Sequence, residues 1–430
     1  MTTSRTGVGT SRRGFLGRAL AAGLGAPLIV PGRVLGRDGG VAPGNRITLG
    51  AIGIGPRGRY VLDCMLEEAD VQFLAICDVQ AARREQVKAL ADATYGNRDC
   101  AMYRDLDELL ARPDLDAVLV ATGDRWHTLA SVRAARAGKD VYSEKPCGLT
   151  IGECAELAGT MHRYGRVFQA GTQRRSIGNF QFAVHLARSG KLGRLHTLHA
   201  SIYQLRVLHD WLPAEPAPAP EVCDWERWLG PAPWRPYNAR YVQGGWRGYY
   251  DFDSGATLLD WGAHTVDLCQ WAHGSDGSAP TRYEPDPDGN TIHARYADGV
   301  KLVLRRDGWL GLGTCPVRFE GDEGWVETGD SGEVTVHPAS LAAERERFAA
   351  GVRGTHPAGH TRNFFDCVKS RRHPACGPDV MRSSHLACHA AAIAWQLKRS
   401  VTLDPATESF VGDAEANRMR TRTQRAPWVS

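Results

Sequence analysis

Apolar and polar positions follow two different patterns along the chain, and the change between them falls close to Ile177. Before that point, short runs that are apolar throughout alternate with segments of helical period. The runs predict strands over 46–53, 71–77, 117–121, 140–143 and 166–171, and the periodic segments predict helices over 59–68, 80–92, 105–111 and 151–164, with a further helix ending at 137. Strands that are apolar on both faces are typical of a parallel sheet between helices. Residues 45–173 are therefore predicted to form an α/β domain.

The second pattern predicts an α+β domain over residues 174–400. A helix over 178–189 precedes a long alternating strand over 195–207. Turn residues separate short strands over 292–296 and 300–304, and again over 317–320 and 325–328, so the sheet is expected to be mostly antiparallel. The helix over 257–272 is expected to cover one face, and helices over 360–370 and 379–398 to close this domain. Residues 401–430 are expected to form a C-terminal arm, polar from residue 404 and ending in Pro427-Trp428.

Residues 209–255 are irregular and rich in tryptophan, tyrosine, proline and glycine. Connections this long are usually functional or disordered, and so many aromatic residues are unlike disorder. Aromatic rings beside Arg240, Arg247, Asp251 and Asp253 suit a sugar-like ligand, which has an apolar face and polar edges. A loop held by its own aromatic side chains, or a subunit contact, explains the same composition, and the sequence leaves these alternatives open.

The first forty residues have the features of an export signal. Ser11-Arg12-Arg13-Gly14-Phe15-Leu16 is a twin-arginine pattern, and the apolar stretch from Ala19 to Val30 follows it. The alternative is a basic, disordered tail. We predict a twin-arginine signal and linker over 1–40, export of the folded chain by the twin-arginine machinery and a periplasmic or cell-envelope location; if that interpretation is wrong, the protein is expected in the cytoplasm.

Composition narrows the range of partners. A chain of 430 residues is long enough for two domains, and its net charge of +4 is small and dispersed, so no nucleic-acid partner is indicated. The eleven cysteines include no CxxC pair and no His/Cys cluster at zinc spacing, so no metal site is expected. Most of these cysteines are expected to be buried.

A glycine-rich turn follows the first strand. Gly53-Ile54-Gly55-Pro56-Arg57-Gly58 is G-x-G-x-x-G between a predicted strand and a predicted helix, the context that dinucleotide binding requires. The second strand ends in Asp78, where an acidic side chain would hold the adenosine ribose hydroxyls. We therefore predict a Rossmann domain for NAD. NADP is less favoured because Asp78 would repel a 2′-phosphate, although Arg83 and Arg84 lie nearby.

Polar residues follow the later strands of the same domain. They are Thr122, Asp124, Trp126 and His127 after the third strand, Glu144-Lys145-Pro146 after the fourth, and Gln173 after the fifth. Ligands bind in the crevice at the carboxyl ends of the strands, so these side chains are candidates for the cofactor site. The sequence does not decide whether the Lys145–Pro146 peptide is cis or trans.

Acidic residues and a histidine share one face of the predicted helix over 257–272. Asp260, His264 and Asp267 are separated by four and three residues, so they project together. Asp260 and His264 could form an acid/base pair, with Asp267 orienting the imidazole. A solvent-exposed stripe with a paired histidine explains the same spacing.

Together these motifs resemble the Gfo/Idh/MocA oxidoreductase family, named for glucose–fructose oxidoreductase, inositol dehydrogenase and rhizopine catabolism. The resemblance covers about residues 45–428, and the tail around His360-Thr361-Arg362-Asn363-Phe364 is similar to an exported branch. It implies a Rossmann domain, a second domain with a large open sheet, and frequent homo-oligomers. Gly123 departs from the proline or asparagine common in the family.

The resemblance also implies roles for individual residues. Lys145, His264 and Asp260 would be catalytic, with His264 as acid/base, Asp260 as its partner and Lys145 beside the reacting carbinol. Cofactor contacts would come from Gly53, Ile54, Gly55, Pro56, Arg57, Gly58, Asp78, Thr122, Asp124, Trp126, His127, Glu144, Lys145 and Gln173. Substrate contacts would come from Arg174, Tyr203, Trp246, Arg247, Tyr249, Asp260 and His264.

Three functions fit this sequence. The first is an NAD-dependent oxidoreductase that transfers hydride at a secondary carbinol of a carbohydrate or polyol. The second follows from export: a trapped cofactor cannot be recycled by diffusion, which suits a redox-neutral NAD-dependent glycoside hydrolase that oxidises, eliminates, adds water and re-reduces. The third is a sugar-binding protein without activity, against which the intact Lys145, Asp260 and His264 argue.

Overall fold

A computed structural model describes residues 41–349 and 353–429. The chain divides into two compact units, 1–46 and 47–430. In the first, only residues 41–46 are described, and they contain the short 3-10 helix η2 (Pro43–Asn45). The predicted twin-arginine signal over 1–40 lies outside the described residues. In the part of the chain that is described, no helix has the length and apolar character needed to span a bilayer.

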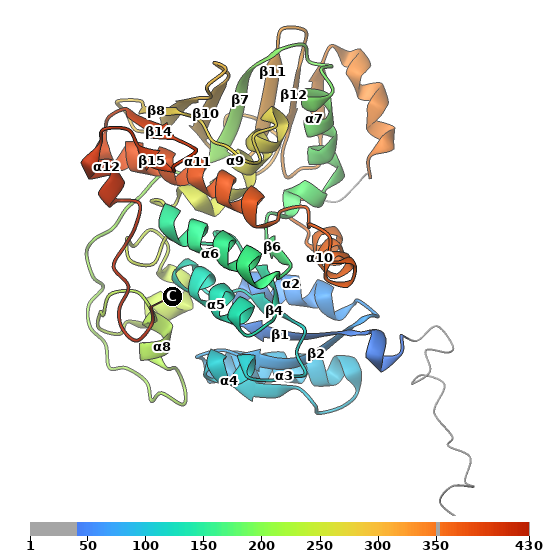
Figure 1. The fold of residues 1–430 in the computed structure, drawn as a ribbon, viewed down its shortest axis with the longest axis vertical. Coiled ribbons are helices and arrows are strands. Elements are labelled where there is room, and N and C mark those ends of the chain that lie inside the picture. Colours follow the sequence, from blue (N-terminus) through green and yellow to red (C-terminus); the bar gives the residue numbers. More distant parts are fainter. Residues whose placement is uncertain (1–40, 350–352, 430) are drawn as a thin grey trace, which may run out of the picture. The chain divides into compact units, whose positions relative to one another are not determined.

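The N-terminal part of the second unit is a six-stranded parallel sheet (Figure 1). Its order is β3-β2-β1-β4-β5-β6, and the strands are β1 (Ile47–Ile52), β2 (Val71–Cys77), β3 (Ala101–Tyr103), β4 (Ala117–Val120), β5 (Asp140–Ser143) and β6 (Phe168–Ala170). The predicted parallel sheet is confirmed, and β3 is an additional strand that the pattern missed because it has three residues. Chain order reverses between β1 and β4, and such a switch point is where open α/β sheets bind ligands.

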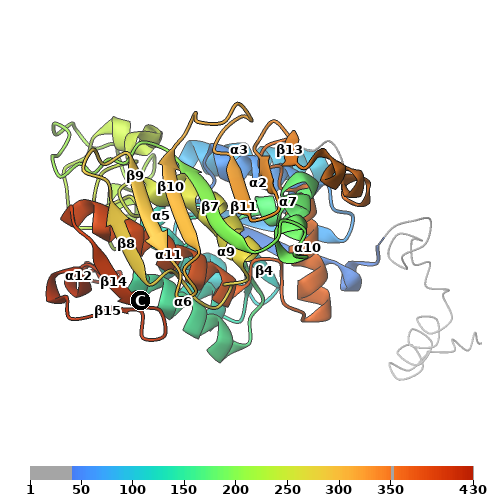
Figure 2. The ribbon, with the colours of Figure 1, turned by 90° about the horizontal axis from the view of Figure 1, so that it is seen from above.

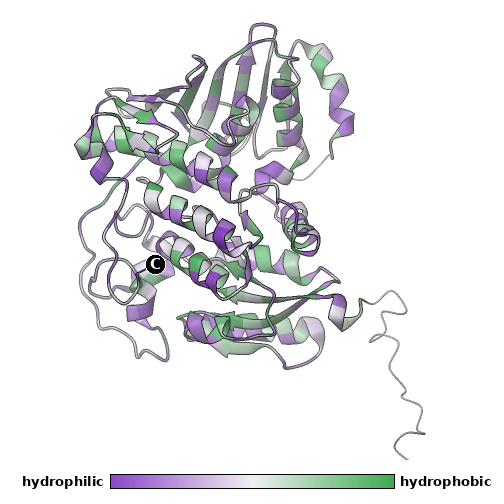
Figure 3. Ribbon diagram, viewed as in Figure 1, coloured by the Kyte–Doolittle hydropathy of each residue, from purple (hydrophilic) through white to green (hydrophobic). Residues whose placement is uncertain are grey.

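Helices cover both faces of this sheet. They are α2 (Pro56–Leu66), α3 (Ala81–Tyr95), α4 (Leu106–Leu110), α5 (Asp124–Arg136) and α6 (Ile151–Tyr164). Local sequence sets their ends: Pro56 occupies the first turn of α2, the Thr150 side chain accepts a bond from the Glu153 N–H, and Gly165 ends α6 in the left-handed region. In Figure 3 the parallel strands are mostly hydrophobic, whereas the helices carry both hydrophobic and hydrophilic positions.

The second part is a nine-stranded mixed sheet of order β13-β12-β11-β7-β10-β9-β8-β14-β15. Its strands are β7 (Leu195–Ile202), β8 (Arg282–Pro285), β9 (Thr291–Arg295), β10 (Lys301–Arg306), β11 (Val317–Gly321), β12 (Trp325–Thr328), β13 (Val334–His337), β14 (Val401–Asp404) and β15 (Ser409–Phe410). Only the β7–β10 pair is parallel among these described strands, so the expectation of a mostly antiparallel sheet is confirmed. The expected arm over 401–430 begins instead with two strands of this sheet, followed by α12 (Ala414–Arg418).

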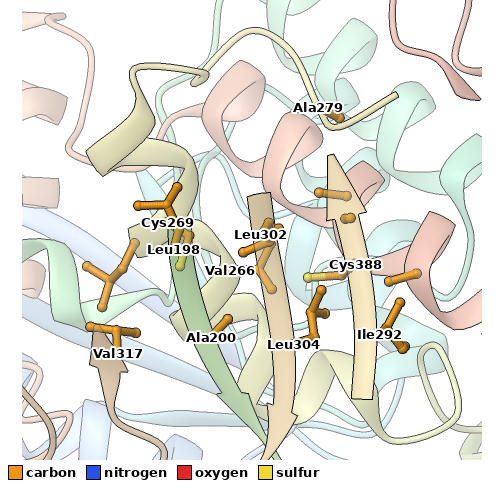
Figure 4. Packing of buried hydrophobic residues seen from close by; sticks show 14 of the residues in the cluster. Leu198, Ala200, Val266, Cys269, Ala279, Ile292, Leu302, Leu304, Val317 and Cys388 are labelled. Atoms are coloured by element: carbon orange, nitrogen blue, oxygen red, sulfur yellow. The ribbon is translucent and has the colours of Figure 1, made fainter. Parts of the chain in front are cut away.

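Helices α7 (Gly178–Arg188) and α9 (Leu258–His273) pack on one face of this sheet. Figure 4 shows Leu198 and Leu302 on the strands beside Val266 and Cys269 of α9, all fully buried. Figure 2 shows the strands from β8 to β11 in front of α9 and α11, and no helix of the described residues covers the other face of these strands. The prediction that residues 257–272 cover one face of the sheet is therefore confirmed.

The last two long helices differ from the prediction. Helix α10 (Ala358–Ser370) packs against α2, and its Phe364 and Phe365 join the core of the parallel-sheet domain. Helix α11 (Pro378–Leu397) packs against both α6 and α9. Helix α10 therefore belongs with the first domain, and α11 joins the two domains, because its apolar residues pack against helices of both.

The aromatic segment forms a small core of its own. Helix α8 (Trp225–Leu229) and the π-helical turn η4 (Tyr241–Gly245) bring together Trp228, Tyr241, Tyr249 and Phe252. The rings of Trp225 and Trp228 stack at 4.7 Å between centroids. Of the alternatives left open by the sequence, a loop held by its own aromatic side chains describes most of this segment.

Candidate functional site

The glycine-rich turn is shaped for close approach. Gly53 has φ of +72°, and a Cβ there would lie 2.4 Å from the Thr122 Cγ2 atom. A Cβ on Gly58 would lie 2.7 Å from that of Ala121, so this glycine lets α2 pack against β4. A Cβ on Gly55 would meet nothing closer than 3.8 Å, which leaves space beside the N-terminus of α2. These residues fit a dinucleotide pyrophosphate, since a helix N-terminus attracts negative charge.

A cavity of about 460 Å³ lies at the carboxyl ends of the parallel strands. It brings together most of the predicted site residues: Gly53, Gly55, Pro56, Arg57, Gly58, Asp78, Thr122, Asp124, Trp126, His127, Glu144, Lys145, Trp246, Arg247, Asp260 and His264. Ile54, Gln173, Arg174, Tyr203 and Tyr249 do not line it. No arrangement of three or more metal-ligating side chains occurs among the described residues, and all eleven cysteines are buried and unpaired.

Asp78 holds the glycine-rich turn in place. Its Oδ2 atom accepts a bond from the Ile54 N–H at 2.9 Å, and its Oδ1 atom accepts one from the Gln80 N–H at 2.9 Å. The side chain is almost fully buried, and burial raises its pKa although Arg83 opposes that shift. Ile54 thus supports the site through its backbone, and Arg83, whose Nη1 atom lies 3.9 Å from Asp78, reduces the negative charge there.

Lys145 reaches from the parallel-sheet domain to α9. Its Nζ atom donates to the Asp260 carbonyl at 2.7 Å and to the Asp260 Oδ1 atom at 3.0 Å. The other carboxylate oxygen of Asp260 lies 3.4 Å from the Nε atom of Arg247. Burial would raise the pKa of Asp260, but Lys145 and Arg247 together lower it below the ordinary value. The Lys145–Pro146 peptide is cis.

His264 has neither of the carboxylate partners that its helix position suggested. Asp260 contacts Lys145 and Arg247 instead, and Asp267 forms a bidentate pair with Arg175 at 2.7 and 2.9 Å. The implied Asp260–His264 pairing and the orienting role of Asp267 are therefore wrong. Helical spacing places three side chains on one face, but the cations packed opposite determine which carboxylate is neutralised.

The imidazole of His264 is buried and held in its neutral form. It is 2% exposed, and its Nδ1 atom has no hydrogen-bond partner among the described residues. Burial, followed by the charges of Lys145, Arg174 and Arg57, lowers its pKa well below the ordinary value. The ring is therefore neutral at neutral pH, which leaves a nitrogen lone pair available as a base.

The guanidinium of Arg247 is surrounded by three carboxyl groups. It contacts Asp124 at 3.2 Å and Asp253 at 3.0 Å as well as Asp260. Asp124 begins α5 and also accepts a bond from the Ser254 N–H. Arg247 thus fixes Asp260 to the loop that follows β4, so the predicted substrate residue has a positioning role. The pairing of Asp253 with Arg247 is local in sequence, but Asp124, the other carboxylate on Arg247, is more than a hundred residues away, so this cluster was not predictable.

The Asp253 carboxyl should make stability depend on pH. Burial and the charge of Asp124 raise its pKa from 3.8 to about 7, against the opposing effect of Arg247. Between these values the native chain holds a proton that the unfolded chain has released, so the free energy of unfolding falls as pH rises, by at most about 1.4 kcal/mol per unit. Urea unfolding of wild type and Asp253→Asn at pH of about 5 and about 7 should show a smaller fall in the variant. Equal falls in both proteins would contradict this.

Three predicted residues, Gln173, Glu144 and Arg57, are linked by polar contacts at the cavity wall. Gln173 donates to Tyr142 at 2.8 Å and to the Glu144 Oε1 atom at 2.7 Å. Glu144, which is buried, also faces the Nε atom of Arg57 at 3.4 Å. Arg57 reaches away to bond the side chain and carbonyl of Thr355, both at 3.1 Å. Gln173 therefore orients Glu144 rather than contacting the cavity.

Arg174 and Tyr249 are placed elsewhere than the resemblance implied. Arg174 is fully buried and donates to Asp330 at 2.6 Å and to the Cys315 carbonyl at 2.7 Å. Tyr249 packs edge-on against Tyr241 within the aromatic core. Neither side chain lines the cavity, because each turns toward partners inside the protein.

Tyr203 belongs to a second cavity of about 360 Å³ that adjoins the first. Arg247 and Asp260 line both cavities. Tyr203 is 40% exposed and packs against Trp261 at 5.7 Å between ring centroids. The two cavities therefore meet at Asp260. A ligand in the second cavity, beside Tyr203, would reach the Lys145–Asp260 pair.

The first turn of α5 is held by contacts with backbone carbonyls. Both ring nitrogens of His127 face carbonyl oxygens, that of Pro146 at 2.6 Å and that of Thr122 at 3.2 Å. The Trp126 indole N–H donates to the Arg227 carbonyl at 2.9 Å. Arg125, which the sequence analysis did not select, also lines the cavity: it stacks on Trp228 at 3.5 Å, and burial lowers its pKa to about 9. Its position between Asp124 and Trp126, at the start of α5, was the available signal.

A parallel-sheet domain with a glycine-rich turn, followed by a second domain, is the arrangement of a protein with an NAD-binding Rossmann fold. Residues 47–172 match the NAD-binding Rossmann fold of an oxidoreductase family, and residues 209–430 match the C-terminal alpha/beta domain of that family. The chain belongs to the Gfo/Idh/MocA oxidoreductase family, as the resemblance indicated.

Relatives of known name are similar over parts of the chain. The protein is 38% identical over 125 residues to a glycosyl hydrolase family 109 protein from Saccharopolyspora erythraea, a match that covers 28% of this chain and only 27% of that relative. It is 26% identical over 333 residues to the rhizopine catabolism protein MocA from Rhizobium meliloti, covering 74% and 90% of the two chains. The WlbA dehydrogenase from Chromobacterium violaceum, solved with NADH and UDP-GlcNAcA, shares the fold with a TM-score of 0.61 at 17% identity, covering 84% of this chain and 96% of that one.

Proposed function

We propose that this protein is an NAD-dependent oxidoreductase that acts on a carbohydrate or polyol by hydride transfer at a secondary carbinol. The observation that carries the proposal is the convergence of the Lys145–Asp260 pair with the imidazole of His264 at one cavity. That cavity also contains the glycine-rich turn and adjoins the space beside Tyr203. A cofactor and a small polar substrate therefore have separate places that meet at these side chains.

The chain's residues supply positioning and proton transfer. NAD, when bound, supplies the hydride acceptor. His264 is neutral, so the imidazole that lines the cavity can take the hydroxyl proton of the carbinol. The ammonium of Lys145 stabilises the developing alkoxide oxygen, and Asp260 holds that ammonium in place. Arg247 keeps Asp260 ionised.

NAD is favoured over NADP because Asp78 would repel a 2′-phosphate. Its two carboxylate oxygens are fixed by backbone N–H groups, so the side chain does not turn away easily. Arg83 weakens the preference without removing it, since its guanidinium is 3.9 Å from Asp78 and also donates to the Val242 carbonyl.

The proposed reaction is tested with purified protein. Gel-filtered protein should release NAD(H) when it is denatured, or the native protein should bind added NADH. Myo-inositol, D-glucose and related polyols, each at saturating concentration, are then screened for reduction of NAD. We expect one or more of them to give NADH with equimolar ketone or lactone. Binding of NAD(H) without oxidation of any carbohydrate or polyol would contradict the proposed reaction.

A redox-neutral glycoside hydrolase is the second candidate, and the similarity to the glycosyl hydrolase family 109 protein favours it. In that reaction a sugar hydroxyl is oxidised, the neighbouring C–H is acidified, the aglycone is eliminated, water adds and the hydride returns. The same Lys145 and His264 would serve it. Release of 4-nitrophenol from a 4-nitrophenyl glycoside in deuterated water, with deuterium at the carbon beside the oxidised one and no net NADH, would identify it.

Export and assembly complete the proposal. The twin-arginine pattern at Arg12-Arg13 supports export of the folded chain by the twin-arginine machinery to the periplasm or cell envelope. The sheet face that carries His199, Arg318 and Trp325 supports a homo-oligomer, since helices cover the opposite face. Light scattering of the purified protein would test the second point.

A further inference from the structure

Residues 420–429, called the strap below, run from α12 back to the parallel-sheet domain. Figure 1 shows this segment passing beside α8 on its way to the label C. At its start the Arg420 carbonyl accepts a bond from the Gly152 N–H of α6 at 2.9 Å. A Cβ on Gly152 would lie 2.9 Å from the Thr421 Cγ2 atom, so the strap lies directly against this helix.

Two arginines fix the middle of the strap to the aromatic segment. Arg422 donates to the carbonyls of Tyr250 at 2.5 Å and Asp253 at 3.2 Å, and it stacks over the Tyr250 ring at 4.1 Å. Arg425 donates to the carbonyls of Ala232 at 3.1 Å and Gly230 at 3.0 Å, and it pairs with Glu226. These contacts use defined backbone acceptors, so the strap has one docked position.

The strap ends on a tryptophan that forms part of the cofactor cavity. The ring of Trp428 meets that of Trp126 edge-on at 5.3 Å between centroids, and both residues line the cavity. Trp126 is held from the other side by Gly230, where a Cβ would lie 2.3 Å from the indole. The indole N–H of Trp428 has no partner among the described residues.

This tryptophan pair lies toward the Asp78 side of the cavity. Trp126 bonds the carbonyl of Arg227, and Arg227 bonds Asp105 at 2.7 Å, just after β3. Strand β3 is at the edge of the sheet beyond β2, whereas Lys145 follows β5 on the other side of the switch point. Since an acidic residue after β2 marks the adenosine half of a dinucleotide site, Trp428 borders that half.

We propose that residues 420–429 are a retention strap for the dinucleotide, with Trp428 closing the adenosine end of the cavity so that the cofactor leaves slowly. The strap follows the second sheet in the chain and contacts the first domain. Release of the cofactor therefore requires that the strap move away from the first domain. A redox-neutral reaction that re-uses one bound NAD requires that the cofactor be released slowly. The inference concerns retention and goes beyond the proposed reaction.

The test compares NADH release from loaded wild type, Trp428→Ala, Trp428→Phe and the control Trp234→Ala, whose side chain is 56% exposed. Each protein is mixed with excess NAD and the loss of NADH fluorescence is followed. We expect release to be about tenfold faster or more in Trp428→Ala, because an aromatic wall against a base is lost. Trp428→Phe should stay close to wild type, and Trp234→Ala should equal it.

An unchanged rate of NADH release from a folded Trp428→Ala protein would overturn the proposal that the strap retains the cofactor. If that protein still oxidised polyols, the proposed reaction would stand. Equal acceleration by Trp234→Ala would also overturn the proposal that the strap retains the cofactor. If Trp428→Ala does not fold, amide exchange in the wild type decides: NAD should slow exchange over 424–429, and no slowing there overturns the proposal. Absence of any NADH binding by wild type would overturn both proposals.

Discussion

Replacing Lys145 by methionine should lower the rate of hydride transfer by about 10³-fold while NADH still binds. The first domain brings this ammonium to the cavity, since the Lys145 backbone follows β5, and Asp260 of the second domain lies 3.0 Å from its Nζ atom. Methionine keeps the length of the side chain and removes the charge that stabilises an alkoxide. Single-turnover absorbance of NADH with saturating polyol measures the chemical step, and fluorescence titration measures cofactor binding.

Lys139 provides the matched control, since it lies just before the same strand and donates to the carbonyls of Arg112 and Leu115 at the opposite end of the sheet. Lys139→Met should lower stability but leave the rate per folded molecule unchanged. Equal rate losses in the two variants, or full turnover by Lys145→Met, would show that Lys145 does not support the reaction.

Replacing Asp267 by alanine should cost about 3–5 kcal/mol of unfolding free energy, because it leaves a buried guanidinium with part of its charge uncompensated. The side chains of Arg175 and Asp267 are 3% and 1% exposed, and Asp276, the second partner of Arg175, is 32% exposed. Urea unfolding measures the loss. Asp63→Ala is the control, since Asp63 and Arg59 form an exposed pair for which about 0–1 kcal/mol is usual.

The same variant separates a structural from a catalytic role for Asp267. Since Asp267 contacts Arg175 and not His264, the folded Asp267→Ala protein should keep the wild-type dependence of kcat on pH. A shifted profile with a stability loss below about 1 kcal/mol would mean that Asp267 acts on the histidine instead.

The sequence predicted those features that depend on neighbours along the chain. The apolar runs predicted the parallel strands, except β3, which has too few residues for a pattern. The glycine spacing predicted the turn after β1, because positive φ at Gly53 and contact at Gly58 are local requirements of a strand–turn–helix unit. The place of Lys145 at the end of β5 was likewise predictable, since strand ends share one edge of a parallel sheet.

The tertiary structure alone decided which charged groups meet. Helical spacing placed Asp260, His264 and Asp267 on one face, but Lys145, Arg247 and Arg175 arrive from distant segments, and their positions assign each carboxylate its partner.

The same limit explains Arg174, Trp428 and α10. Arg174 follows a strand end but turns into the protein toward Asp330, and Trp428 reaches the cavity from a strap some three hundred residues beyond Trp126. Phe364 of α10 packs in the core of the first domain, where α10 lies against α2. A sequence pattern specifies which face of an element is apolar or charged. What packs against that face depends on the whole chain, and those long-range contacts determine the chemistry of this site.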